Sequence, residues 1–297
     1  MADLYLVATP IGNLDDLSPR AAALLARVEI IAAESVTRTR GLLSHLGLTG
    51  KKLVSCREAN RGQAARSVVG FLDQGRDVAL VSDAGTPGIS DPGAVVVRAA
   101  AAAGHRLCPL PGPSALAAAL SVAGLEPGPV VFLGFPPVKP GPRRRLMAQV
   151  AALGWGLVLF EGPHRLAATA ADLAEVLGER PVVLCREISK VHEEVAHTST
   201  GELARETARR TRENAPAARG EVTLVVHGGA PPAAEAPDLD ELLREGLARG
   251  EGSPSRLAKQ VAKATGRPRE EIYRRLLALR AAEEGRAEGA AEELAED

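Results

Sequence analysis

The chain has 297 residues, of which 45% are hydrophobic and 2% aromatic, and its formal net charge at pH 7 is −1. This length allows two domains with separate cores, and the near-neutral balance argues against a surface that binds polyanions everywhere. Three widely spaced cysteines without a ligand-like pattern predict neither a disulfide framework nor a metal site. No apolar run reaches membrane-spanning length and no signal peptide is evident, so we expect a cytoplasmic protein with no membrane partner.

Short apolar runs alternate with helical patterns through the first part of the chain. Strands are expected at 4–8, 28–33, 52–55, 77–82 and 105–110. Helices are expected near 19–27, 38–46, 63–74, 92–103 and 114–122. Near-continuous apolar strands that alternate with helices predict an α/β domain with a parallel sheet covered on both faces, which we place at 1–123.

A second set of strands and helices follows and predicts a second α/β domain at 124–229. Its strands are expected at 130–135, 156–161, 181–187, 193–198 and 221–226. Its helices are expected near 143–152, 163–177 and 200–212. Some of the connections are too short to hold a helix, so the second sheet is expected to be mixed.

The C-terminal part changes in composition. Residues 230–238 are rich in Pro and Ala and predict a linker, and 239–281 predict three short amphipathic helices. Their buried stripes are expected to hold Leu257, Val261, Ile272, Leu276 and Leu279. Residues 253–280 carry eight basic and two acidic side chains, whereas the end of the chain is acidic. We expect 282–297 to be a disordered acidic tail.

Helix starts are marked at three places by a capping residue followed by proline. These pairs are Ser18-Pro19, Asp91-Pro92 and Ser253-Pro254. Ser and Asp side chains accept hydrogen bonds from the first free backbone N–H groups of a helix, and proline suits its first turn. Each pair therefore predicts the N-terminus of a helix.

Three loops rich in Gly, Pro and Ser follow the first, fourth and fifth predicted strands, at 8–14, 82–93 and 109–115. Ligands of open α/β sheets bind beyond the carboxyl ends of the strands, and small residues let the backbone approach them closely. Neither a G-x-G-x-x-G fingerprint nor a P-loop is present. The residues alone therefore predict a small-molecule or nucleotide-like ligand in a cleft, with three merely tight connections as the alternative.

Seven stretches together resemble the tetrapyrrole methylase-like family, and more particularly its members that act on ribosomal RNA. They are "LYLVATPIGNLDDLSPRA" (4–21), "ALVSDAGTPGISDPG" (79–93), "PLPGPSALAAALSVAGL" (109–125), "FLGFPP" (132–137), "FEGPHRL" (160–166), "REISKVHEE" (186–194) and "GEVTLVV" (220–226). The resemblance covers roughly 4–280 in order. It implies two α/β domains of the tetrapyrrole methylase type with a small C-terminal helical appendage.

The resemblance also implies a cofactor, a reaction and partners. The cofactor is S-adenosyl-L-methionine, bound in the cleft between the domains, and the reaction is 2′-O-methylation of a cytidine in the decoding centre of 16S rRNA. The implied partners are small-subunit rRNA or the 30S subunit and a second copy of the chain in a homodimer. The positions implied for the cofactor are Pro10, Ser82, Asp83, Ala84, Gly85, Ile89, Ser114, Ala115, Phe135 and Leu166.

Proton removal from a ribose hydroxyl would be helped by a nearby carboxylate or histidine. The candidates are Glu34, Glu58, Glu161, His164 and Glu187, and no choice among them follows from the sequence. Glu187 could instead belong to a surface or interface charge set with Arg186 and Lys190. Glu34 and Glu58 could instead pair with neighbouring arginines, and His164 could be structural. The chain also lacks the second acidic residue of the family's Ala-Glu-Asp-Thr-Arg run and both histidines of its "HDHNE"-like stretch, so no role tied to those residues is carried over.

Basic side chains that could meet RNA phosphates form two groups. The first lies on an expected Pro/Gly-rich loop and comprises Lys139, Arg143, Arg144 and Arg145. The second decorates the C-terminal helices and comprises Arg256, Lys259, Lys263, Arg267, Arg269, Arg274 and Arg275. The alternative for both groups is an ordinary solvated helix face.

Two other functions remain open beside rRNA methylation. A small-molecule methylase acting on a porphyrin or corrin would share the fold, but the basic appendage argues against it. A non-catalytic RNA-binding factor of ribosome assembly would explain the departures around residues 34 and 57, but not the presence of three ligand-binding loops.

Overall fold

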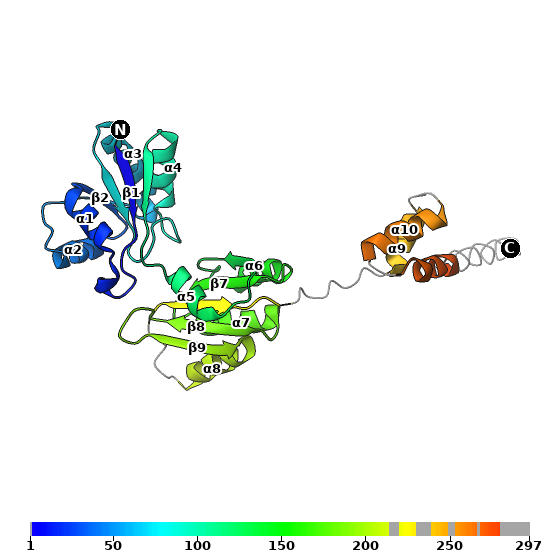
Figure 1. Ribbon diagram of the computed structural model, residues 1–297. Coiled ribbons are helices and arrows are strands. Elements are labelled where there is room, and N and C mark those ends of the chain that lie inside the picture. Colours follow the sequence, from blue (N-terminus) through cyan, green and yellow to red (C-terminus); the bar gives the residue numbers. More distant parts are fainter. Residues whose placement is uncertain (1, 214–219, 230–238, 249–252, 266–267, 280–297) are drawn as a thin grey trace, which may run out of the picture. The chain divides into compact units, whose positions relative to one another are not determined.

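The computed structural model describes residues 2–213, 220–229, 239–248, 253–265 and 268–279 (Figure 1). Contacts divide the chain into two units, Met1–Gly229 and Ala230–Asp297, and each is described by itself. No helix in these described ranges is long and apolar enough to cross a membrane. The predicted linker and the predicted acidic tail lie outside the described residues.

The first sheet of unit 1 is parallel throughout, as predicted. Its strands are β1 (Asp3–Val7), β2 (Ile30–Ala33), β3 (Lys52–Ser55), β4 (Val78–Val81) and β5 (Arg106–Leu110). They lie in the order β3-β2-β4-β1-β5. Because every strand runs the same way, the loops after β1, β2, β4 and β5 all leave from one edge.

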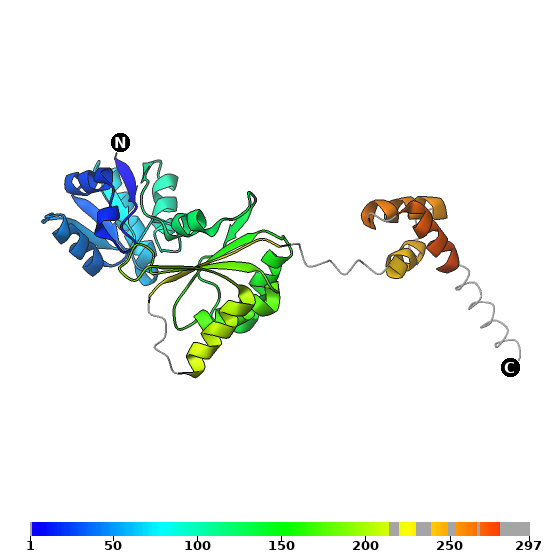
Figure 2. The same cartoon turned by 60° about the horizontal axis from the view of Figure 1, so that its bottom comes forward.

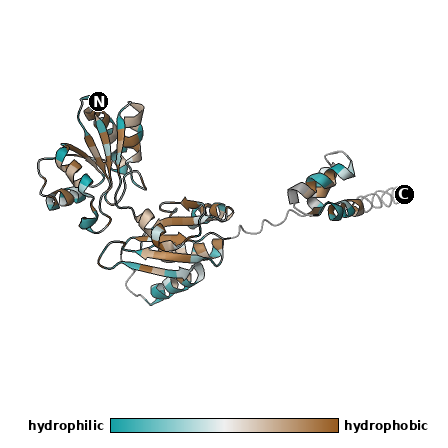
Figure 3. Cartoon of the chain, viewed as in Figure 1, coloured by the Kyte–Doolittle hydropathy of each residue, from teal (hydrophilic) through white to brown (hydrophobic). Residues whose placement is uncertain are grey.

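Helices cover both faces of this sheet. They are α1 (Pro19–Arg27), α2 (Val36–His45), α3 (Arg61–Asp73) and α4 (Ala94–Ala102), with 3-10 turns at Leu14–Asp16 and Glu58–Asn60. Ile31 packs with α1 and α2 on one face, whereas its neighbour Ile30 packs with α3 and α4 on the other. Buried faces on both sides explain why the strands read as unbroken apolar runs, which Figure 3 shows as brown arrows.

The second sheet is mixed, which confirms the prediction. Its strands are β6 (Val130–Phe132), β7 (Gly156–Glu161), β8 (Pro181–Arg186), β9 (Glu194–Ser199) and β10 (Val222–Val226). They lie in the order β6-β7-β10-β8-β9. Only β6 and β7 pair in parallel, and the other three pairs are antiparallel.

Helices α6 (Pro140–Ala151), α7 (Leu166–Leu177) and α8 (Thr200–Arg212) cover one face of the second sheet (Figure 2). Helix α5 (Ala115–Ala123) covers the other face, where Ala119 and Ala123 pack against buried valines of β7, β8 and β10. From the sequence, α5 was expected in the first domain. Its buried face instead packs on the second sheet, so the chain passes from the first sheet to the second after β5. We call the first sheet with its helices the first layer, and the second sheet with its helices the second layer.

Two of the three predicted helix starts are confirmed. Ser18 caps α1 by accepting a hydrogen bond from Ala21 N, and α10 begins at Pro254. The expected start at Asp91 is wrong, because α4 begins at Ala94 without a side-chain cap. The Asp91 carboxylate instead accepts hydrogen bonds from Gly88 N (2.7 Å) and Gly93 N (2.6 Å), and so folds the preceding loop.

Unit 2 contains the predicted short helices, which are α9 (Leu239–Ala248), α10 (Pro254–Thr265) and the helical residues 269–279. The predicted apolar stripes meet in one core with Leu243 of α9. Arg275 donates two hydrogen bonds to the Asp240 carboxylate, at 2.7 and 2.6 Å, and so ties the last helix to α9. Arg275 therefore has a structural partner within its own unit.

Arg143 is not on an exposed loop, and that expectation is wrong. It lies in α6 with its side chain 3% exposed, and its Nε is 2.6 Å from the equally buried carboxylate of Asp172. Its Nη1 donates to Val138 O at 3.0 Å. The other Asp172 oxygen accepts from Arg144 at 2.7 Å. Arg143 therefore fixes α6 against α7 and is not available to RNA.

Replacing Asp172 by Asn should lower the free energy of unfolding by about 3–5 kcal/mol, because it leaves the buried guanidinium of Arg143 without its counter-charge. Urea unfolding followed by fluorescence of Trp155 measures this change. Glu175→Gln is the matched control, since Glu175 pairs only with the half-exposed Arg144, and should cost less than about 1 kcal/mol. Equal losses in the two variants would contradict a dominant role for the buried pair.

Candidate functional site

The loops after β1 and β4 are joined backbone to backbone. Thr9 N donates to Gly85 O at 2.9 Å, and Gly85 N donates to Thr9 O at 3.0 Å. The Thr9 hydroxyl also donates to Ser82 O at 3.1 Å. Gly85 has a φ of +81°, in the left-handed region that favours glycine. Two loops that are more than 70 residues apart therefore form one rigid floor.

The third predicted loop joins the same floor. The Thr86 hydroxyl donates to Pro113 O at 3.3 Å, which ties the loop after β4 to the loop after β5. Beside this contact, the Ser114 side chain caps α5 by accepting from Ala117 N. The three loops singled out in the sequence thus converge at the carboxyl edge of the first sheet.

A cavity of about 250 Å³ opens above this floor and is closed by the second layer. From the first layer it is lined by Ile11, Glu34, Arg38, Ser82, Asp83, Ala84, Gly85, Thr86, Ile89, Ser90 and Asp91. From α5 and the second sheet it is lined by Ser114, Ala115, Phe135, Phe160, Glu161, Glu187, Ile188, Lys190, Glu221, Val222 and Thr223.

Most of the positions predicted for a cofactor line this cavity. They are Ser82, Asp83, Ala84, Gly85, Ile89, Ser114, Ala115 and Phe135. Two predicted positions lie elsewhere: Pro10 precedes the lining residue Ile11, and Leu166 is buried in the core beneath the second sheet. Leu166 begins α7, so its side chain follows the apolar stripe of that helix and does not reach the cavity.

Glu34 lies at the carboxyl end of β2 and shares a reciprocal contact with Asp83. The Glu34 carboxylate accepts from Asp83 N at 3.2 Å, while the Asp83 carboxylate accepts from Ser35 N at 2.8 Å. Arg38 Nη1 is 3.4 Å from the other Asp83 oxygen. Burial raises the pKa of Glu34, and the negative charges of Asp83 and Asp91 add to the effect. Glu34 is thus a cavity carboxylate with increased basicity.

Glu161 also lines the cavity, but its oxygens are already engaged. Oε2 accepts from the Thr169 hydroxyl at 2.5 Å, and Oε1 accepts from Gly162 N at 2.9 Å. Arg165 Nε lies 3.1 Å from Oε1 as an ion pair, and Arg165 Nη2 donates to Pro136 O at 2.6 Å. This buried network holds the segment that carries Phe135, so the geometry favours a positioning role for Glu161.

Glu58 and His164 are not brought to the cavity. Glu58 lies exposed in the 3-10 turn before α3 and pairs with Arg61, one turn along the chain. His164 is exposed in the turn that follows β7. Neither side chain is among the lining residues, so the structure separates these two catalytic candidates from Glu34 and Glu161.

The wall formed by the second sheet holds Phe135, as predicted, and an ion pair whose place at the cavity was not predicted. Phe135 is 56% exposed at the cavity, with its ring centroid 5.6 Å from that of Phe160. Lys190 Nζ lies 2.8 Å from Glu187 Oε1 and 3.4 Å from Glu221 Oε2. This pair lines the cavity, and the positive φ of Glu187 (+52°) beside it is not revealed by sequence patterns.

The cavity wall is predominantly acidic. Six carboxylate residues line it, against the two cationic side chains of Arg38 and Lys190. A small-residue floor, two aromatic rings and an excess of negative charge together suit a ligand with an aromatic group and a positive charge. The described parts of the chain contain no group of three or more residues suited to hold a metal ion.

The matching family model is that of the Tetrapyrrole (Corrin/Porphyrin) Methylases, and it covers residues 3–204. The chain belongs to this family, which confirms the resemblance seen in the sequence.

Close relatives carry the name Ribosomal RNA small subunit methyltransferase I. The protein of that name from Neisseria meningitidis is 47% identical over 224 residues, 75% of each chain. Those from Xylella fastidiosa and Synechocystis are 42% and 41% identical, and cover 91% and 95% of this chain and 97% and 99% of their own. The similarity therefore extends beyond unit 1 into the C-terminal helices.

Solved structures share the fold at low sequence identity. The methyltransferase CobJ superposes with a TM-score of 0.58 at 18% identity, covering 77% of this chain and 95% of its own. The uroporphyrin-III C-methyl transferase of Thermus thermophilus complexed with S-adenosyl homocysteine gives 0.52 at 21% identity, covering 76% and 97%. These similarities establish the architecture of unit 1.

Replacing Glu34 by Gln should stabilise the protein at pH 7. Because burial raises the pKa of this carboxyl above its unfolded value, the ionised form costs stability once the pH exceeds about 4.3. The gain should therefore shrink towards zero as the pH falls below about 4. Thermal unfolding across this pH range measures it. Glu58→Gln, at an exposed carboxylate, should show no such gain, and an equal gain there would contradict the assignment.

Proposed function

We propose that this chain is an S-adenosylmethionine-dependent methyltransferase that modifies the 2′-oxygen of a cytidine ribose in the decoding centre of 16S rRNA. The observation that carries the proposal is the acidic, small-residue cavity at the joined loops after β1, β4 and β5. It occurs in a chain that is similar over most of its length to proteins named for small-subunit rRNA methylation.

The cavity residues fit the proposed methyl donor. Gly85 and its small neighbours allow the backbone to approach a nucleoside, and Phe135 offers apolar surface for an adenine ring. The excess of carboxylates favours the positively charged sulfonium of the donor. When bound, the donor supplies an electrophilic methyl group and its own leaving group.

Proton removal from the acceptor hydroxyl is assigned to Glu34. Its pKa is raised by burial, so the carboxylate is a stronger base than a solvated glutamate. Asp83 N holds one Glu34 oxygen at 3.2 Å, which leaves the other for the hydroxyl. Glu161 acts by positioning, because its network with Arg165 and Thr169 holds the Phe135 segment at the cavity.

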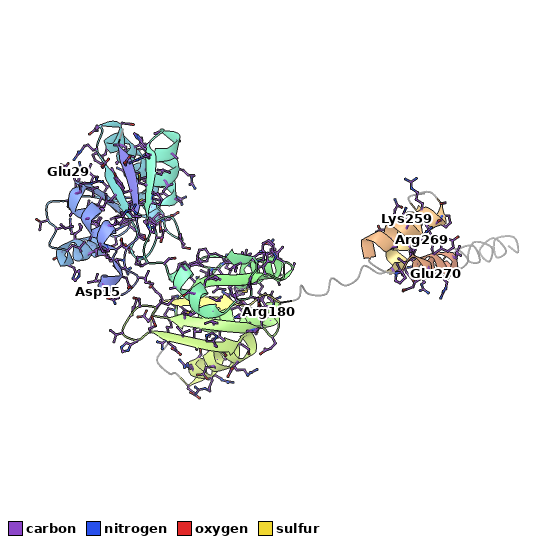
Figure 4. The ribbon with its side chains drawn as sticks, viewed as in Figure 1. Asp15, Glu29, Arg180, Lys259, Arg269 and Glu270 are labelled. Carbon is purple, nitrogen blue, oxygen red and sulfur yellow. The ribbon has the colours of Figure 1, made fainter. Side chains whose placement is uncertain are left out.

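Exposed basic side chains on each unit are proposed to contact RNA. They are Lys139 and Arg145 in unit 1 and Arg256, Lys259, Arg269 and Arg274 in unit 2. Figure 4 labels Lys259 and Arg269 on the helices of unit 2. Arg144 and Arg275 are engaged by carboxylates. The side chains of Lys263 and Arg267 lie outside the described residues.

Further features of the proposal follow from an rRNA substrate. Action on rRNA or the 30S subunit places the protein in the cytoplasm, and we propose that it acts as a homodimer, as the family resemblance implies. The second candidate function is methylation of a porphyrin or corrin, which the family model and the shared fold favour. The cluster of exposed basic residues in unit 2 favours RNA over that smaller acceptor.

Methyl transfer to 30S subunits from a strain that lacks the gene tests the proposal. Labelled methyl should appear in a 2′-O-methylated cytidine identified by mass spectrometry. Gly85→Leu should abolish donor binding in calorimetry and transfer with it, because its side chain would enter the cavity from a left-handed backbone position. Label in a tetrapyrrole, or in no acceptor despite donor binding, would overturn the RNA assignment.

The role of unit 2 is tested by replacing Arg256, Lys259 and Arg274 together by Ala. Donor affinity should be unchanged, whereas binding to 30S subunits should weaken and the slope of log K against log salt concentration should fall by about 2. The matched control removes the same charge from α1, α3 and α4 by replacing Arg20, Arg66 and Arg98. Equal weakening in both variants would show a non-specific effect of charge.

A further inference from the structure

The turn between β8 and β9 is held in an unfavourable backbone conformation at the cavity. Glu187 and Ser189 have φ values of +52° and +66°, which non-glycine residues rarely adopt. Such strain persists where the surroundings impose it, and it concentrates at functional sites. Here it places Glu187, Ile188 and Lys190 together on the cavity wall.

Contacts from both layers impose this conformation. Ser189 hydrogen-bonds to Asp16 of the first layer. The Lys190 stem lies against Gly12, where an added Cβ would come within 2.2 Å of Lys190 Cγ. A Cβ added at Gly220 would likewise come within 2.2 Å of the Glu187 carboxylate. Two glycines without side chains are thus needed for the Glu187–Lys190 pair to take its place.

The pair leaves hydrogen-bonding capacity for a ligand. Glu187 Oε1 accepts from Lys190 Nζ at 2.8 Å and from Glu221 N at 3.0 Å. Among the hydrogen bonds of the described residues, none reaches Oε2. Lys190 uses two of its three N–H groups, on Glu187 and on Glu221 at 3.4 Å. The cavity wall therefore presents an acceptor and a donor side by side.

We propose that Glu187 and Lys190 contact the base of the acceptor nucleotide and select cytosine over uracil. This inference rests on the proposed methylation of a cytidine. The pair becomes a specificity determinant of that site, separate from the proton transfer assigned to Glu34.

The hydrogen-bonding edges of the two bases explain the selection. Cytosine carries an N4 amino donor next to its N3 acceptor, and a carboxylate next to an ammonium complements this pattern. Uracil carries an O4 acceptor next to an N3–H donor, so its oxygen would face Glu187 Oε2 and its N–H would face Lys190. Two acceptors would then face each other at Glu187 and two donors at Lys190. All four groups would be left buried without hydrogen bonds.

Other features of the same wall suit an unstacked base. Enzymes that act on a nucleotide inside a folded strand extrude it, and they hold the base by its edge and by an aromatic face. Phe160 lines the cavity with Glu187 and Lys190, and its ring packs edge-on against Phe132 with centroids 4.9 Å apart. The cavity wall formed by the first sheet offers fewer free hydrogen-bonding groups, since the Asp83 carboxylate accepts from Ser35 N and pairs with Arg38.

Affinity-tagged 30S subunits that carry C or U at the modified position test the inference. The wild-type enzyme should methylate the C form faster, with a ratio of kcat/KM on the order of 5- to 150-fold, the range of a well-formed base contact. Glu187→Gln retains size and can turn its amide to either base, so the ratio of kcat/KM for the C and U forms should fall towards one. Lys190→Met should also lower the ratio.

The controls separate the possible failures. Glu194→Gln makes the same charge change at the end of the same turn, but Glu194 pairs with Arg186 outside the cavity lining, so the wild-type ratio should persist. If the wild-type enzyme labels neither RNA, the proposed function fails. If it labels C and U forms equally, or if Glu187→Gln keeps the full ratio, only the base-reading inference is overturned. This test remains valid if Lys190→Met does not fold.

Discussion

The backbone pairing of Thr9 with Gly85 is the interaction on which the rest of the site depends. A parallel sheet brings the ends of β1 and β4 to the same edge, but it does not by itself order the loops beyond them. Two reciprocal hydrogen bonds at 2.9 and 3.0 Å form an isolated antiparallel bridge between the two loops beyond the ends of these parallel strands. The floor of the cavity is therefore held by hydrogen bonds between its loops, although it is rich in the Gly, Pro and Ser residues typical of turns.

Two arginines hold the opposite wall by other means. Arg165 and Arg143 donate to the carbonyl oxygens of Pro136 and Val138, and their charges are balanced by Glu161 and Asp172. A loop next to a cavity exposes carbonyl groups that must find donors, and a guanidinium can satisfy one while it remains paired with a carboxylate. A replacement that keeps the charge of either arginine but loses its branched set of donors would therefore remove a hydrogen bond that holds the Phe135 segment.

The sequence predicted the architecture well, because hydrophobic periodicity and the positions of Gly and Pro are local signals. Every strand and helix of unit 1 was expected within a few residues, and so was the convergence of the three loops. The failures are all non-local. Nothing in the sequence near Asp91 indicates that its carboxylate closes a loop instead of capping a helix, and nothing near Arg143 reveals the buried Asp172. The role of α5 depended on which sheet its alanine face would meet.

The candidate site was predictable in part for the same reason. Cavity positions on loops that follow strands were found from the loops themselves, whereas Leu166, the first residue of α7, was misplaced because α7 turns its apolar stripe into the core. Glu34, Glu58, Glu161 and His164 looked equivalent as isolated residues. Burial and partners separate them: an exposed ion pair for Glu58, an exposed ring for His164, a saturated carboxylate for Glu161 and a partly free one for Glu34.

Charge is distributed in a way that the net value of −1 conceals. The cavity lining is acidic, whereas the charged residues of α10 in unit 2 are all basic. An acidic cavity repels phosphate groups, so a nucleotide can enter it only with its neutral base and ribose, while its phosphates remain outside. The same field attracts a cationic donor. On the proposed function, a single arrangement of charge therefore favours the sulfonium, orients the acceptor with its ribose inward, and leaves the RNA backbone to the basic side chains on the surface.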